Sequence, residues 1–255
     1  MTALRRPVLA GNWKMFKGPT ETRAFFSAFL SAYPEREDRT VVFFPPAVSL
    51  DAARQGTAER ADVLLGVQDV YWEKQGAFTG QISAPMAADA GASLVLVGHS
   101  ERRHVFGETP EDTARKVRAA LDAGLRPVLC VGEKIEERRA GRAEATVREQ
   151  LDAVLPGLSA EDAGRLLVAY EPVWAIGTGA TATPEDAAVM HAEVRARLRE
   201  AFGEEAAAAV PILYGGSVKP DNARELLSAP EVDGVLVGGA SLDPAGFAAI
   251  CTATG

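Results

Sequence analysis

Short apolar runs recur along the whole chain, and amphipathic stretches separate them. The runs are continuous instead of alternating with polar residues, which is typical of strands buried on both faces of a parallel sheet. Eight runs stand out: Val8–Ala10, Val41–Phe44, Val63–Leu65, Leu94–Val97, Val128–Val131, Leu166–Ala169, Pro211–Leu213 and Val235–Val237.

The stretches between the runs have the repeat of amphipathic helices. In each of three sets the apolar residues fall on one helical face. The sets are Ala114, Val117 and Leu121; Val147, Leu151, Val154 and Leu155; and Met190, Val194, Leu198 and Phe202. Two helix starts are marked by Thr109-Pro110 and Thr183-Pro184, because each offers a capping hydroxyl, a proline and then two acidic residues.

Eight strands that alternate with helices predict an α/β fold in the form of a (β/α)8 TIM barrel. The chain has 255 residues and no low-complexity linker, so we expect residues 1–255 to form a single domain. A doubly wound open sheet remains the alternative, since its strands are also parallel and covered. In both architectures the functional residues follow the carboxyl ends of the strands.

Composition narrows the classes of partner. The net charge of −8 does not attract nucleic acid or an anionic membrane, and no apolar run approaches the roughly 20 residues of a membrane span. No signal peptide is evident after Arg5 and Arg6. Cys130 lies inside an apolar run and Cys251 is the only other cysteine, which favours free thiols and a cytoplasmic protein.

The segment from Ala169 to Gly179 is the most informative of the chain. A strand ends at the carboxylate of Glu171, and Pro172, bulky apolar residues and two glycines follow. This order predicts a base at a strand end beneath a loop that closes and excludes water. A plain strand–turn–helix junction is the alternative. Ala182 stands where a dinucleotide fingerprint needs its third glycine.

Glycines follow the last two runs, in Gly215-Gly216-Ser217 and Gly238-Gly239. Exposed backbone N–H groups there, each with a helix N-terminus behind it, would bind a phosphate dianion. Barrels often hold phosphate after strands seven and eight. A tight turn is the alternative for either pair alone.

Candidates for acid–base chemistry follow other runs. Glu171 is a candidate base, His99 a candidate electrophile and Lys14 a fixed cation. If the first strand continues past Asn12, Asn12 and Lys14 point the same way. A purely structural role is the alternative for His99. Three histidines and no Cys/His/carboxylate spacing predict no metal site.

Taken together, the strand-end motifs resemble one family, the triosephosphate isomerases. They occur in family order over nearly the whole chain. The motifs are Gly11–Lys14, Gly76–Gly80, Val97–Arg103, Cys130–Glu133, Tyr170–Gly179, Tyr214–Val218 and Gly234–Leu242.

The resemblance implies interconversion of dihydroxyacetone phosphate and D-glyceraldehyde 3-phosphate through an enediolate, in glycolysis and gluconeogenesis. Carried over from the family, Glu171 is the base, a neutral His99 polarises the carbonyl, and Lys14 and Asn12 hold the substrate. The resemblance also implies that no metal or organic cofactor is needed. The implied phosphate ligands are the backbone N–H groups of Gly177, Ser217, Gly238 and Gly239.

The family resemblance further implies a homodimer. The loop Gln68 to Thr79 would reach the partner, with Thr79 near Asn12 of the partner subunit. From the residues alone, the segment is an aromatic loop with Tyr71, Trp72 and Phe78, and such a surface needs cover.

Three positions depart from the family pattern. Ala180 replaces a basic residue after the glycine hinge, so the hinge motion is affected more than the chemistry. Gln81 replaces a glutamate that pairs with an arginine across the dimer; if Arg102 is that arginine, the loss is modest. Asp243 replaces a lysine outside the phosphate site, and we expect little consequence.

Two other functions are weighed. A Schiff-base aldolase would use Lys14 as its nucleophile, but it leaves Glu171 and the lid unexplained. A sugar-phosphate-binding barrel without turnover would be expected to lack the base or the electrophile, and both are present.

Overall fold

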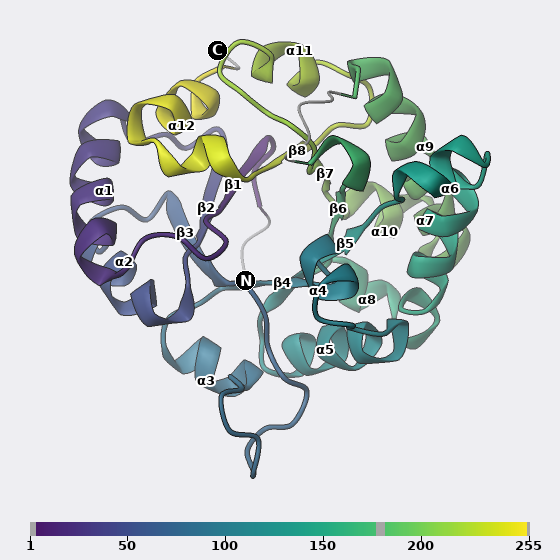
Figure 1. Cartoon of the computed structure of the whole chain (residues 1–255), viewed down its shortest axis with the longest axis horizontal. Coiled ribbons are helices and arrows are strands. Elements are labelled where there is room, and N and C mark those ends of the chain that lie inside the picture. The colour runs from purple at the N-terminus through teal and green to yellow at the C-terminus, as the bar shows by residue number, and fades with distance from the viewer. Residues whose placement is uncertain (1–3, 177–181, 254–255) are drawn as a thin grey trace.

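A computed structural model describes residues 4–176 and 182–253 of the chain. Eight parallel strands close into a barrel in sequence order, β1 to β8 (Figure 1). The barrel closes where β1 (Val8–Asn12) pairs with β8 (Gly234–Val237), with Val8 opposite Gly234. This closure confirms the predicted (β/α)8 barrel and contradicts the open-sheet alternative.

Each predicted run coincides with a strand, with ends that differ by at most two residues. Between β1 and β8 the strands are β2 (Thr40–Phe44), β3 (Val63–Val67), β4 (Leu94–Val97), β5 (Arg126–Val131), β6 (Leu167–Tyr170) and β7 (Ile212–Tyr214).

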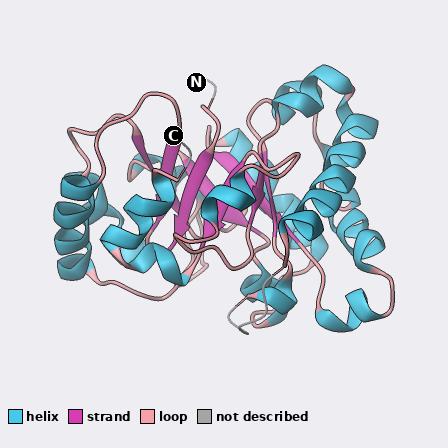
Figure 2. Ribbon diagram, turned by 90° about the horizontal axis from the view of Figure 1, so that it is seen from above, coloured by secondary structure: helices cyan, strands magenta, loops and turns pink. Residues whose placement is uncertain are grey.

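Helices surround the barrel on its outside, and Figure 2 shows the strands between them. The described helices are α1 (Pro19–Ala32), α2 (Leu50–Gly56), α3 (Ala84–Asp89), α4 (Ser100–His104), α5 (Pro110–Asp122), α6 (Ile135–Arg139), α7 (Ala143–Asp152), α8 (Ala160–Ala163), α9 (Pro184–Phe202), α10 (Glu204–Ala209), α11 (Ala223–Leu227) and α12 (Pro244–Cys251). Four 3₁₀ turns are described as well: η1 (Ala47–Ser49), η2 (Leu155–Gly157), η3 (Val173–Ala175) and η4 (Gly239–Leu242).

The core has two layers, which explains why the strand sequences are apolar throughout. Side chains alternate along a strand, so Val8 and Ala10 of β1 belong to a cluster that fills the barrel. Leu9, between them, packs in the cluster shared with the surrounding helices. Because both faces are buried, an alternating polar pattern cannot appear.

The predicted helix starts are confirmed. Thr109 and Thr183 are the N-caps of α5 and α9, and each hydroxyl accepts a hydrogen bond from the third residue of its helix. One helical face is shorter than predicted, because α7 ends at Asp152 and Val154 lies beyond it. Val154 is still buried, so the prediction of burial holds although the helix has ended.

The loop from β3 to α3 extends beyond the ring of helices (Figure 1). Its aromatic side chains pack on one another, with ring centroids of Tyr71 and Trp72 4.0 Å apart and those of Tyr71 and Phe78 4.6 Å apart. Among the described helices, none combines the length and the apolar character needed to cross a bilayer.

Candidate active site

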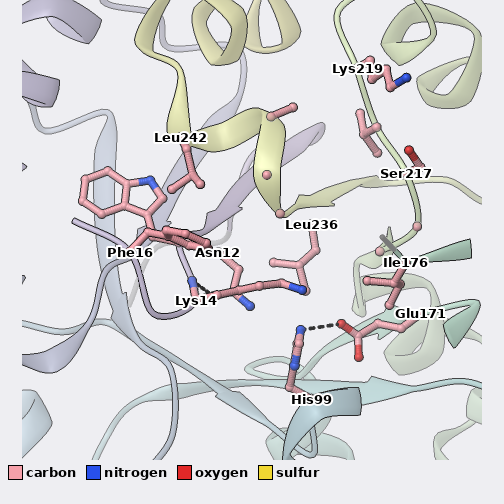
Figure 3. Close-up of a pocket in the computed structure, with 17 residues that line it drawn as sticks. Asn12, Lys14, Phe16, His99, Glu171, Ile176, Ser217, Lys219, Leu236 and Leu242 are labelled. Atoms are coloured by element: carbon pink, nitrogen blue, oxygen red, sulfur yellow. Dashed lines mark hydrogen bonds and ion pairs between the residues drawn. The ribbon is translucent and has the colours of Figure 1, made fainter. Parts of the chain in front are cut away.

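A pocket of about 370 Å³ opens at the carboxyl ends of the strands (Figure 3). This is within the usual size of small-molecule sites, roughly 300–1,000 Å³. The pocket is lined by every predicted site residue that the structure describes, namely Asn12, Lys14, His99, Glu171, Ser217, Gly238 and Gly239. Gly177, the remaining predicted site residue, lies outside the described part of the chain.

His99 and Glu171 meet at the base of the pocket. His99 follows β4 by two residues and Glu171 follows β6 directly, and both side chains are buried. Nε2 of His99 lies 3.0 Å from Oε1 of Glu171 (Figure 3). Gly215 leaves room for this carboxylate, because a Cβ there would approach Cγ of Glu171 to 2.9 Å.

The start of α4 orients both groups. The backbone N–H of Glu101 donates to Nδ1 of His99 at 3.3 Å, and that of Ser100 donates to Oε2 of Glu171 at 2.9 Å. Since Nδ1 accepts a hydrogen bond, the proton of a neutral imidazole resides on Nε2. His99 therefore presents an N–H toward Glu171 and the pocket.

The two groups shift each other's protonation. Burial raises the pKa of Glu171, but the charge and hydrogen bond of His99 and the N–H of Ser100 lower the pKa more, so the net direction is down. Burial lowers the pKa of His99, but the charge and hydrogen bond of Glu171 raise it more. While the contact lasts, the lowered pKa of Glu171 keeps this residue ionised. The upward shift in the pKa of His99 depends on that carboxylate.

Lys14 reaches the pocket by a different path from the one considered for an extended strand. β1 ends at Asn12, and Lys14 has a φ of 51°, so the extended conformation does not continue. The backbone N–H of Lys14 instead donates to Oδ1 of Asn12 at 2.9 Å. The ammonium of Lys14 lies 2.7 Å from Oε1 of Glu101.

Two residues at this end escaped the sequence analysis. Glu101 appeared there only inside the motif Val97–Arg103, and Gln68 only as the start of the loop Gln68 to Thr79. The amide of Gln68 donates to the carbonyl oxygens of Lys14 at 2.7 Å and Phe44 at 2.9 Å. Neither spacing nor residue type in the sequence signalled that these side chains support Lys14.

The other end of the pocket is formed by the glycine-rich strand ends. Gly239 begins η4, so one helix start follows β8 as predicted. The expected helix start behind β7 is absent at that point, because α11 begins at Ala223, well past Ser217. Lys219, which the sequence analysis also missed, is an exposed cation at the rim (Figure 3).

Comparison with known proteins shows which family this chain resembles. Residues 7–254 match the family model described as Triosephosphate isomerase. The chain belongs to the triosephosphate isomerase family. Proteins named triosephosphate isomerase from Solibacter usitatus and Symbiobacterium thermophilum are each 51% identical to it; the alignments cover 97% and 98% of this chain and 99% and 97% of those proteins. The crystal structure of triosephosphate isomerase from Bartonella henselae aligns with a TM-score of 0.86 at 39% identity, covering 97% of this chain and 98% of that one.

For the departures from the triosephosphate isomerase pattern that lie in the described part of the chain, the structure shows the local contacts. Asp243 is the N-cap of α12, and its Oδ2 accepts the N–H of Gly246 at 2.6 Å. Arg102 is held within its own chain by Asp69 at 3.1 Å and Glu108 at 3.3 Å, while Gln81 is exposed. Ala180 lies outside the described residues.

The described part of the segment after β6 is anchored to the barrel. The indole N–H of Trp174 in η3 donates to Oε1 of Glu133 at 2.8 Å, and the hydroxyl of Tyr170 donates to the same oxygen at 3.1 Å. The guanidinium of Arg138 stacks over the Trp174 ring at 4.7 Å. Trp174, two residues after Pro172, is thus tied to Glu133, which follows β5.

Proposed function

We propose that this chain interconverts dihydroxyacetone phosphate and D-glyceraldehyde 3-phosphate, as a step of glycolysis and gluconeogenesis. One observation carries the proposal: an ionised carboxylate and an imidazole N–H lie 3.0 Å apart at one end of a pocket whose other end is glycine backbone. A proton-transfer pair and an anion site at opposite ends suit a small phosphorylated carbonyl compound.

The phosphate would bind first among the backbone N–H groups of Gly177, Ser217, Gly238 and Gly239. Backbone N–H groups at a helix start favour a dianion. The phosphate does not react, so its binding energy serves to hold the reacting carbons near Glu171 and His99. Lys14, whose Cε would lie 3.5 Å from a Cβ on Gly238, adds a positive charge for the developing enediolate.

Glu171 would then remove a proton from the carbon next to the carbonyl. The substrate must pass between Glu171 and His99, and it breaks their 3.0 Å contact when it does so. The influence of Glu171 that raises the pKa of His99 weakens with that contact, while burial, which lowers the pKa, remains. His99 therefore acts as a neutral donor that polarises the carbonyl oxygen and returns a proton to the enediolate.

The lid supports this chemistry by excluding water. An enediolate phosphate that meets water can lose its phosphate, so closure over the pocket protects the intermediate. Ile176, on the described part of the lid, already lines the pocket, and Trp174 is bonded to Glu133. Closure would exchange contacts of this anchored segment without moving the barrel.

The alternative functions fit less well. A Schiff-base aldolase needs an uncharged lysine amine as nucleophile. Lys14 is instead engaged in an ion pair with the carboxylate of Glu101 at 2.7 Å, so its amine is not free to attack a carbonyl. A binding barrel without turnover would not need a buried base in contact with a buried histidine.

A coupled assay of D-glyceraldehyde 3-phosphate isomerisation tests the proposal. Glu171→Gln should lower kcat by at least about 1,000-fold, because the amide cannot accept the proton. Glu59→Gln, at an exposed position far from the pocket, is the matched control and should behave as wild type. A wild-type protein that binds dihydroxyacetone phosphate without turnover would support the binding barrel, and borohydride labelling would support the aldolase.

We also propose a homodimer formed through the loop Gln68 to Thr79, and a cytoplasmic location suited to two buried free thiols. Large apolar side chains are exposed in the segments that follow β1, β3 and β4, namely Met15 at 94%, Phe78 and Phe106. A monomer rarely leaves such a set uncovered. The partner's loop would cover it.

Thr79→Arg tests this interface. Thr79 is exposed in the isolated chain, so an arginine leaves the fold intact but places a charge in the proposed contact. We expect the dimer to dissociate at micromolar concentration and the activity to fall with it. Ser27→Arg, which adds the same charge on the outer face of α1, is the control. Sedimentation that finds an intact and fully active Thr79→Arg dimer contradicts the assignment.

A further inference from the structure

The pairing of β4 with β5 ends at Val97, so Gly98, the residue before His99, is no longer part of the sheet. The last registered pair between β4 and β5 is Val97 with Leu129, and Gly98 then turns out of the sheet with a φ of 69°. The carbonyl oxygen of Val131 accepts the N–H of Glu171 on the β6 side of β5. Because carbonyls alternate along a strand, that of Cys130 faces β4, where the ladder has ended.

Arg103, in α4, bridges this gap. Its Nε donates to the carbonyl oxygen of Gly98 at 2.7 Å, and Nη2 donates to that of Cys130 at 3.0 Å. The backbone N–H of Arg103 also donates to the carbonyl oxygen of His99 at 3.1 Å. The carbonyl oxygens of both peptide groups that flank His99 therefore accept hydrogen bonds from Arg103.

The peptide before Gly98 is held from the other direction. Oε1 of Glu108 accepts the N–H of Gly98 at 3.1 Å. Glu108 is itself buried and paired with the ammonium of Lys116 at 2.6 Å. Gly98 is thus held at its N–H by a carboxylate and at its carbonyl by a guanidinium.

Close packing around Gly98 leaves little room for the guanidinium of Arg103 to move. A Cβ on Gly98 would lie 2.5 Å from Nη2 of Arg103 and 3.0 Å from Cγ2 of Thr113. Packing this close means that a shift of the guanidinium is passed directly to the peptide that carries His99. Acid–base catalysis is sensitive to such shifts, because a misplacement of about 1 Å can cost about 100-fold in rate.

We infer that Arg103 is a positioning residue for His99, which aims Nε2 at the reacting atoms by holding the peptide groups on both sides of the histidine. The inference rests on the proposed function, since it assigns a role within that acid–base site. Arginine suits the task better than lysine, because its planar fork reaches two carbonyls in fixed directions.

The first test is Arg103→Lys in the full-length protein, with steady-state kinetics. A lysine keeps the charge but bridges the two carbonyls poorly, so kcat should fall by about 10- to 100-fold while KM changes by less than about threefold. Arg165→Lys is the matched control: Arg165 also donates to a carbonyl, that of Leu121 at 2.8 Å, and is not among the pocket residues. Its kinetics should match wild type.

A double-mutant cycle separates positioning from general stability. If Arg103 acts through His99, Arg103→Lys should cost little further activity in a His99→Gln background. A full additive loss in that background, or an unchanged kcat in Arg103→Lys, overturns the inference. If Arg103→Lys folds poorly, Arg103→Gln, which can still donate to one carbonyl, takes its place in the cycle.

Nuclear magnetic resonance of the histidine side chains gives a readout that does not depend on turnover. The Nε2 signal of His99 should shift or broaden in Arg103→Lys, while that of His191 in α9 should stay in place. An unchanged His99 signal overturns the inference. A wild-type protein without isomerase activity would instead contradict the proposed function, whatever the spectra show.

Discussion

The two ends of the pocket are built in opposite ways. At the acid–base end, the buried side chains of His99 and Glu171, which follow β4 and β6, contact each other and the backbone N–H groups at the start of α4. At the phosphate end, the pocket wall is backbone, with Gly238 and Gly239 after β8 and Ser217 after β7. One end depends on side-chain networks, and the other depends on the path of the chain.

The difference follows from the chemistry proposed for each end. Moving a proton requires groups whose protonation can change, and their environment has to set the pKa of each. Binding a dianion requires only fixed N–H donors, which any residue except proline supplies and which glycine exposes best. Substitutions should therefore act on kcat at the first end and on phosphate recognition at the second.

After removal of the carboxylate itself by Glu171→Gln, the largest effect should come from shortening the base. Glu171→Asp retracts the carboxylate by one methylene, away from both His99 and the substrate carbon, so kcat should fall by about 100- to 1,000-fold with little change in KM. Glu59→Asp is the control. A kcat near that of wild type in steady-state assays would show that Glu171 is not the base. The acid–base end would then not differ from the phosphate end in its dependence on side chains.

A smaller effect should follow from deleting one backbone donor. Gly239 is the first residue of η4, where proline fits the helix but lacks the N–H. Losing one hydrogen bond to a charged group costs about 1.5–3 kcal/mol, which is roughly 10- to 100-fold in kcat/KM.

Gly239→Ala keeps the N–H, and its Cβ would meet no atom within 4 Å, so it is a matched control. With D-glyceraldehyde, which has no phosphate, Gly239→Pro and Gly239→Ala should react alike. Equal losses by Gly239→Pro on both substrates would mean that this residue does not act through the phosphate.

The smallest effect concerns the layer between the barrel and α9. His191 is fully buried between the rings of Tyr170 in β6 and Tyr214 in β7, with centroids 6.0 Å and 6.5 Å away. Burial lowers the pKa of His191 from 6.5 to about 4. The folded state thus favours the neutral ring, and its stabilising contribution is present above pH 6.5 and is lost as pH falls toward 4.

Between pH 7 and pH 5 this amounts to about 2 kcal/mol of unfolding free energy. Urea denaturation over that range measures it, and His191→Gln should show a weaker pH dependence than wild type. Identical slopes for the two proteins would show that His191 does not carry the acid sensitivity.

Much of this organisation was predictable from the sequence. Eight buried apolar runs, the caps Thr109 and Thr183, and the residues directly after each strand follow from local patterns, and they placed Glu171 and His99 correctly. The support of Lys14 was not predictable. Its left-handed backbone and its contacts with Glu101 and Gln68 join segments far apart in the chain, and no local spacing encodes them.

By itself, the sequence determined which residues could do chemistry and at which strand ends they stand, because burial periodicity and strand-end chemistry are local properties. Only the tertiary structure decided how those residues act on one another. Pairing of β4 and β6 with opposite edges of β5 brings their ends within reach, so that His99 and Glu171 share a hydrogen bond. Gly98 shows the same division: its sequence permits the turn, and the packed barrel supplies Arg103 and Glu108 to hold it.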